Sequence, residues 1–287
     1  MFVDDAFMLH TSSNKQATKN ELRAIASHDI TSWNDGLHAS GGKLCGQKTV
    51  CYIIKWKFND EGIPIIDEDN GTNSTTAEVL SPETRRIIPI KEIKPNIAIK
   101  MLGVHIAGSL KNDTEYEKLT KKAVKFATTI QVCPLTKTQV ILAIKTIYKP
   151  AIEYVLPATT FTGKQIQNIH KKVMPRMLSK SGISRNYPRA LVFGPVELGG
   201  LGFPHIGYLQ LATKTNQVIK NVRANTTLGK TFRIMMEHAQ MQAGIEEQIL
   251  SSSEQIKYIE SEWIKSLQGG LQNIGAKITI KTTGHRN

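Results

Sequence analysis

The sequence predicts an α+β fold, with short strands and one helix over residues 1–110 and a mainly helical region from residue 111 onward. Two observations predict it. Apolar residues recur at three- and four-residue spacing over residues 18–39 and through most of the chain after residue 111, which is typical of amphipathic helices. Residues 49–58 and 97–106 are instead short apolar runs rich in β-branched residues, which is typical of strands.

The charge of the chain is unevenly distributed. The net charge of +13 arises entirely within residues 111–235, which hold 20 basic and 5 acidic residues. A concentrated excess of Lys and Arg is the usual electrostatic footprint of a nucleic-acid partner. A solvated basic face, or a surface that meets anionic lipid or an acidic protein, would give the same pattern.

Composition excludes several classes of protein. No window approaches the ~18 uninterrupted apolar residues of a membrane span, and the acidic, then polar, N-terminus does not resemble a signal peptide. The three cysteines, Cys45, Cys51 and Cys133, have no metal-binding spacing and fit a reducing compartment. We therefore expect an intracellular protein that is neither secreted nor membrane-bound, with the nucleus as one candidate compartment.

The N-terminal residues place two adjacent carboxylates between two apolar runs. Residues 1–10 predict a strand pair with Asp4 and Asp5 at its tip. Adjacent aspartates repel each other, and their natural counterpart is a hard divalent cation such as Mg²⁺, which prefers carboxylate oxygens. An acidic surface turn is the alternative interpretation of the same residues.

The rest of the N-terminal part alternates between helix and strand. A helix over residues 18–39 should end at Ser40-Gly41-Gly42. A strand follows over 49–58, and the polar stretch 59–83 predicts a long surface loop or a hairpin excursion. Residues 97–106 predict another strand, in which Gly103 should mark a bulge or a close backbone approach.

The C-terminal part predicts a series of helices. The first begins near Asn112 to Thr114, the second runs from about Thr138 and should kink or end at Pro150, and the third contains Pro175. Residues 181–204 are rich in Gly and Pro and predict a linker. Further helices are expected over 206–222, 230–250 and 253–268, and residues 277–283 could form a strand.

Basic side chains lie off the apolar stripes of the first and third of these helices, where they could follow a phosphate backbone independently of sequence. The predicted nucleic-acid-binding residues are Lys118, Lys121, Lys122, Lys125, Lys164, Lys171, Lys172 and Arg176. Arg185 and Tyr187 in the predicted linker could contact a strand or belong to a plain loop. The run Gly199-Gly-Leu-Gly202 lacks the Gly-Lys-Ser/Thr ending of a phosphate loop and predicts a structural turn.

Several segments, in this order, resemble the reverse transcriptases of non-LTR retrotransposons. The first is an aromatic-x-Asp-Asp hairpin, the next a helix and Gly-rich turn leading to a lysine, then a Leu-Gly-Val strand, and last a basic helical block. The residues that carry the resemblance are Phe2-Val-Asp-Asp5, Trp33-Asn-Asp-Gly-Leu37, Ser40-Gly-Gly-Lys-Leu44, Gln47-Lys-Thr49, Lys100-Met-Leu-Gly-Val-His-Ile106, Tyr154-Val-Leu-Pro157 and Gly199-Gly-Leu-Gly202.

The resemblance implies an RNA-directed DNA polymerase that uses an RNA template, a DNA primer and deoxynucleotides. Asp4 and Asp5 would bind a pair of Mg²⁺ (or Mn²⁺) ions, which activate the attacking oxygen and stabilise the leaving one. Lys48, with Lys43 as a competitor, would stand near the leaving pyrophosphate. The primer grip would be Leu102, Gly103 and Val104.

The resemblance also implies a domain organisation: residues 1–110 as a partial polymerase palm, 111–180 as a basic, thumb-like helical region, and 181–287 as a linker and C-terminal helices of unknown role. The chain begins at the hairpin, and the fingers and the palm strand with a third aspartate are not seen. We therefore expect a fragment that does not polymerise alone. The alternatives are a non-catalytic nucleic-acid-binding helical module or remnant, and a helical scaffold whose basic face meets an acidic protein.

Overall fold

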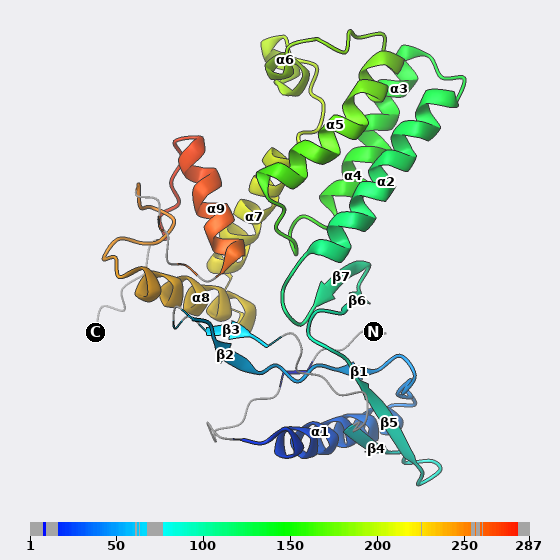
Figure 1. Cartoon of the computed structure of the whole chain (residues 1–287), viewed down its shortest axis with the longest axis vertical. Coiled ribbons are helices and arrows are strands. Elements are labelled where there is room, and N and C mark those ends of the chain that lie inside the picture. The colour runs from blue at the N-terminus through cyan, green and yellow to red at the C-terminus, as the bar shows by residue number, and fades with distance from the viewer. Residues whose placement is uncertain are drawn as a thin grey trace. The chain divides into compact units, whose positions relative to one another are not determined.

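The computed structural model describes residues 8–9, 17–60, 62, 64–67, 77–224, 226–253, 256, 259 and 261–280. The chain forms two compact units, Met1–Thr114 and Glu115–Asn287. The first combines one helix with short strands and the second is helical, so the fold is mixed α+β as the sequence predicts (Figure 1). Residues 115–287 form one unit, so the expected boundary at residue 180 does not separate compact parts.

The helix of the first unit confirms the prediction for residues 18–39. Helix α1 spans Lys19–Ala39. Thr18 caps it, because its hydroxyl accepts from the Glu21 N–H while the Glu21 carboxylate accepts from the Thr18 N–H at 2.7 Å. Ile30 and Asn34 are buried on the face that packs against strand β4 (Ala77–Leu80).

A small three-stranded sheet supports α1. Its order is β1 (Val50–Cys51), β5 (Ile87–Glu92) and β4; β1 pairs parallel to β5, and β4 pairs antiparallel to it. Along β4, Ala77 and Val79 are buried and alternate with exposed residues, so one face of the sheet joins Ile30 of α1 in the core. Strand β5 lies between the loop predicted over 59–83 and the strand predicted over 97–106, where no element is predicted.

Two predicted strands are divided in the structure. The single strand predicted over 49–58 is divided into β1 and β2 (Trp56–Phe58). Strand β2 pairs antiparallel with β3 (Pro64–Ile66), so the first part of the segment predicted as a loop or hairpin over 59–83 belongs to a hairpin. The strand predicted over 97–106 is also a hairpin, of β6 (Ala98–Met101) and β7 (Val104–Ala107). The prediction of one continuous strand is wrong in both places.

Eight α-helices are described from residue 113 onward, and none of the described helices is long and apolar enough to cross a membrane. Helices α2 and α5 run alongside each other (Figure 1). Their buried stripes, including Leu119, Ala127, Ile169 and Val173, lie in the core. The helices in chain order are α2 (Asp113–Val132), α3 (Lys137–Ala143), α4 (Lys149–Glu153), α5 (Gly163–Lys180), α6 (Arg189–Phe193), α7 (Ile206–Arg223), α8 (Thr227–Ala243) and α9 (Glu262–Asn273), of which α2 begins at the unit boundary.

The second predicted helix does not end at Pro150 but changes its helical type directly before it. A π-helical turn, η1 (Ile144–Tyr148), joins α3 to α4, and Pro150 lies in the first turn of α4. Pro150 has no N–H to donate to a helical carbonyl, and directly before it the Lys149 N–H donates to the Ile144 carbonyl five residues earlier, which is the π-type irregularity. The buried side chains of Ile144, Tyr148 and Ile152 continue one apolar face through this change of helical type.

The predicted linker is an ordered part of the second unit, so that prediction is wrong. It contains α6 and a 3-10 turn, η2 (Val196–Leu198), and Val192 and Phe203 are buried. A Cβ atom on Gly200 would overlap the backbone carbonyl of Gly194, and one on Gly194 would lie 2.7 Å from the Ala190 carbonyl oxygen. Glycine is therefore needed at both positions so that the two backbone segments can touch, as a structural turn requires.

Helices α7, α8 and α9 share a second apolar cluster, which includes Val218, Met236 and Leu267. The helix predicted over 230–250 is shifted, because α8 ends at Gly244, whose φ of 65° favours glycine. The helix predicted over 253–268 begins later than predicted, because Ser261 caps α9. Residues 276–280 form no strand, and residues 281–287 lie outside the described residues.

The half-buried His170 contacts the start of α7. The Ile206 N–H donates to Nε2 of His170, and the ring of His170 lies 4.7 Å from that of His205 and 5.2 Å from that of Phe193. Burial, the nearby His205 and Arg189 together lower the pKa of His170 from 6.5 to about 4. Burial also lowers the pKa of His205.

These shifts predict acid sensitivity. Because His170 is neutral in the folded state, the unfolded state binds more protons between pH 6.5 and about 4. The free energy of unfolding therefore decreases as the pH is lowered through that window. We expect His170→Gln, which keeps an acceptor but cannot be protonated, to reduce this loss by about 2 kcal/mol. Urea unfolding at about pH 6.5 and pH 4.5 measures it. The exposed His238→Gln should retain the full loss; equal losses in both variants would contradict the assignment.

Candidate nucleic-acid interface

A concave basic surface lies between α2 and α5 in the second unit. It has a volume of about 530 Å³. We call it the basic groove, and it is lined by Val124, Gln131, Lys171, Lys172, Pro175, Arg176, Ser179 and Arg185. Four of these eight residues are cationic and none is acidic.

The position of α5 follows from its sequence. Thr162 caps the helix in a reciprocal pair with Gln165. Its apolar residues are buried, so Lys171 and Lys172 point outward and are exposed. Tyr116 of α2 fixes the two helices together, because its hydroxyl accepts from the Asn168 amide at 2.6 Å and its ring lies 6.2 Å from that of Phe161.

Pro175 lies within α5 at the wall of the groove. Proline has no N–H, so the carbonyl of Lys171 lacks its usual helical donor four residues later. The Arg176 guanidinium donates to the carbonyl of Lys172 at 3.0 Å and so folds back along this part of the helix. Backbone and side chain therefore hold Arg176 at the rim next to the proline.

The cations of the groove are not neutralised within the described part of the chain. None of Lys171, Lys172, Arg176 and Arg185 forms an ion pair with a described carboxylate. Neighbouring like charges on one helix destabilise it slightly. An anionic ligand would relieve this repulsion, and arginine in particular binds phosphate oxygens through two parallel N–H donors.

The structure brings together only part of the predicted basic set. Lys171, Lys172 and Arg176 line the groove. The other predicted residues are exposed on α2 and at the start of α5 but do not line it: Lys118, Lys121, Lys122, Lys125 and Lys164. They could contact nucleic acid only outside the groove.

Three polar residues of the groove are absent from the predicted binding set. Arg185 follows α5 in the segment predicted as a linker, where a plain loop is one of the two interpretations. Ser179 and Gln131 come from the ends of α5 and α2. Ser179 is spaced from Lys172 and Arg176 by about whole helical turns, so the sequence alone indicates that it shares their face of α5.

The predicted catalytic aspartates, Asp4 and Asp5, lie outside the described residues. Among the residues that the structure does describe, no three His, Cys, Asp or Glu side chains come together as a metal site. The proposed metal pair therefore rests on the sequence.

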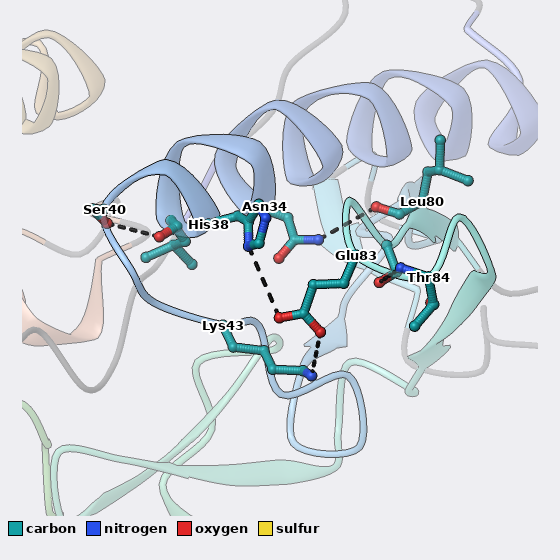
Figure 2. Close-up of polar contacts among 9 residues, drawn as sticks. Asn34, His38, Ser40, Lys43, Leu80, Glu83 and Thr84 are labelled. Carbon is teal, nitrogen blue, oxygen red and sulfur yellow. Dashed lines mark hydrogen bonds and ion pairs between the residues drawn. The ribbon is translucent and has the colours of Figure 1, made fainter.

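The two candidate lysines after α1 have different surroundings. Lys43 forms an ion pair of 2.8 Å with Glu83, a residue that also faces His38 at the end of α1 (Figure 2). The hydrogen bond from Lys43 lowers the pKa of Glu83. Lys48 is exposed in the turn before β1, and no described carboxylate pairs with it. Lys48 is therefore the freer of the two cations.

The predicted primer grip is a tight hairpin turn. Leu102 and Gly103, with φ of 46° and 87°, join Met101 of β6 to its pairing partner Val104 of β7. Two residues with positive φ are typical of a two-residue hairpin turn. Leu102 is 67% exposed, while Val104 is buried. Gly103 thus serves a turn, and the predicted bulge or close approach within a strand is wrong.

A scan against protein-family models and a search of curated proteins found no match to this chain.

Proposed function

We propose that this chain is part of an RNA-directed DNA polymerase of the reverse-transcriptase type, and that its second unit binds the nucleic acid. In this proposal the first unit contributes part of a palm and α2 to α5 form a thumb-like region. The observation that carries the nucleic-acid assignment is the basic groove, in which Lys171, Lys172, Arg176 and Arg185 converge without a described acidic partner.

The polymerase assignment is supported by the ordered resemblance of the sequence. Asp4 and Asp5 would hold Mg²⁺ or Mn²⁺ for nucleotidyl transfer, Lys48 would act near the pyrophosphate, and the turn at Leu102-Gly103 with Val104 would contact the primer. The 287 residues contain no segment that resembles the fingers or the strand with a third aspartate. We therefore propose that these residues alone do not extend a primer. Template-dependent extension by the purified chain would contradict this.

The groove makes a direct prediction for binding. We expect the chain to bind an RNA–DNA primer–template with an affinity that falls steeply with salt, because released counterions drive the association. Replacing both Lys171 and Lys172 by glutamine should weaken binding about tenfold or more and reduce the slope of log K against log salt by about 1.5 to 2, since each phosphate contact adds about 0.9. Fluorescence anisotropy across a salt series measures both quantities.

The matched control is Lys220→Gln, an exposed lysine on α7 that does not line the groove. Its affinity and salt slope should equal those of the wild type. If the double variant binds as tightly as this control, the groove is not the interface. If no nucleic acid binds at all, an acidic protein becomes the better candidate partner.

A non-catalytic nucleic-acid-binding module is the second candidate, and it is favoured by one observation: every residue of the groove belongs to the second unit. Asp4→Ala should leave binding unchanged under both candidates. The two differ in metal dependence. Under the polymerase proposal, Mn²⁺ binding by the full chain should fall in Asp4→Ala, whereas a module without catalysis should bind Mn²⁺ equally in both.

A further inference from the structure

We propose that the basic groove is a binding site for a phosphate group with two or more negative charges, supplied either by the end of a nucleic-acid strand or by a free polyphosphate. The strand-end source rests on the proposed function; the polyphosphate source does not. A surface that only follows the phosphate backbone of a nucleic acid would need no more than a row of separate cations. The shape and the charge of the groove are the two features that distinguish it from such a surface.

The charges converge on one cavity. Lys172 and Arg176 are four residues apart on α5 and share a face, Lys171 lies beside them, and Arg185 enters from the loop after the helix. An internal phosphodiester carries one negative charge and two free oxygens. A terminal phosphate carries close to two charges and three free oxygens. Four cations around one cavity therefore suit a terminal phosphate or polyphosphate better than a single internal diester.

The cavity is also large enough for such a group. Its volume of about 530 Å³ is within the range of about 300–1,000 Å³ that is typical of small-molecule sites. Ser179 and Gln131 add a hydroxyl and an amide donor at its wall, and Val124 and Pro175 supply apolar surface. Arginine forks with neighbouring hydroxyl and amide donors are the groups that bind phosphate oxygens with defined geometry.

The test compares two 12-nucleotide DNA strands that differ only in a 5′-phosphate or a 5′-hydroxyl, each with a 3′ fluorophore. At about 150 mM salt, where exposed charges are strongly screened, we expect the full chain to bind the phosphorylated strand at least about fivefold more tightly. Inorganic tripolyphosphate should displace it. Arg185→Gln should abolish the preference, and because Arg185 is exposed in a loop, this variant should fold normally. Lys220→Gln should keep it.

The possible results distinguish a strand end from a free polyphosphate as the ligand, and they distinguish failure of the phosphate site from failure of the proposed function. Loss of the preference in Arg185→Gln supports the strand end as the source. Tripolyphosphate binding that depends on Arg185, with no preference between the strands, supports the free polyphosphate. Equal binding of both strands without displacement by tripolyphosphate overturns the inference but leaves the proposed function intact. Failure of all three probes to bind overturns both.

Discussion

Replacing Arg23 by methionine should destabilise the first unit by about 3–5 kcal/mol, because it leaves a buried carboxylate without its cation. Arg23 of α1 donates from Nε and Nη2 to one carboxylate oxygen of Glu92 at the end of β5, at 3.0 and 2.7 Å. The side chains are only 11% and 2% exposed. The second oxygen of Glu92 has no hydrogen-bond partner among the described residues, so Arg23 is the main described group that offsets the buried charge.

Lys43→Met is the matched control, because Lys43 also pairs with a carboxylate at 2.8 Å, but at the surface. Exposed ion pairs contribute about 0–1 kcal/mol, so the control should lose little. Urea unfolding followed by hydrogen exchange of β4 and β5 peptides reports on this unit alone. The double variant Arg23→Met, Glu92→Met should recover much of the loss. Similar losses in Arg23→Met and Lys43→Met would contradict the burial argument.

A second large effect should come from Lys214 of α7, whose side chain is fully buried. Its ammonium donates to the Thr160 hydroxyl at 2.7 Å and lies 5.2 Å from the centre of the Trp263 ring. Burial lowers the pKa of Lys214 from 10.5 to about 7, although the nearby Glu262 opposes this. A neutral amine is therefore favoured in the folded protein just above neutral pH.

The unfolded chain binds one more proton than the folded chain between about pH 7 and pH 10.5, so stability should rise with pH across that window. From about pH 7.5 to 9.5 the rise should be about 2 to 3 kcal/mol, at 1.36 kcal/mol per unit. Lys214→Met, which keeps the apolar stem, should lack this rise and be more stable than the wild type near pH 7. Chemical unfolding at the two pH values measures it.

The exposed Lys220→Met on the same helix provides the comparison, and its stability should rise with pH as the wild type does. If Lys214→Met keeps the whole rise, the titrating group is elsewhere. The thiol of Cys51 is not that group, because burial raises its pKa and a raised thiol pKa makes stability fall as the pH rises.

Most of the helices could be predicted from the sequence, because the signals that specify them are local. Thr18, Thr136 and Thr162 cap three of them in reciprocal pairs, and apolar stripes predict the buried faces of α2 and α5. The strands were less readable. β5 and the division between β1 and β2 depend on pairing partners far along the chain, so a local alternation of residues does not specify them.

The site was readable only in part. Charge concentration and helical spacing predict Lys171, Lys172 and Arg176, because all three lie on one helix. Arg185 enters the groove only because the segment after α5 folds back, held by contacts such as the Ile183 N–H to the carbonyl of Leu178. Gln131 comes from another helix altogether. Residues that meet only through the tertiary fold have no regular spacing in the sequence that would predict their contact.

The contact between Gly194 and Gly200 affects how a mutational scan of this protein would be interpreted. Any side chain at Gly200 would strike the opposite backbone, so substitutions there would remove binding by disturbing the fold. Neither glycine lines the basic groove. A mutational scan that measures only binding would therefore wrongly assign these two positions to the binding site. Paired measurements of protein abundance would remove this error and leave the residues that touch the ligand.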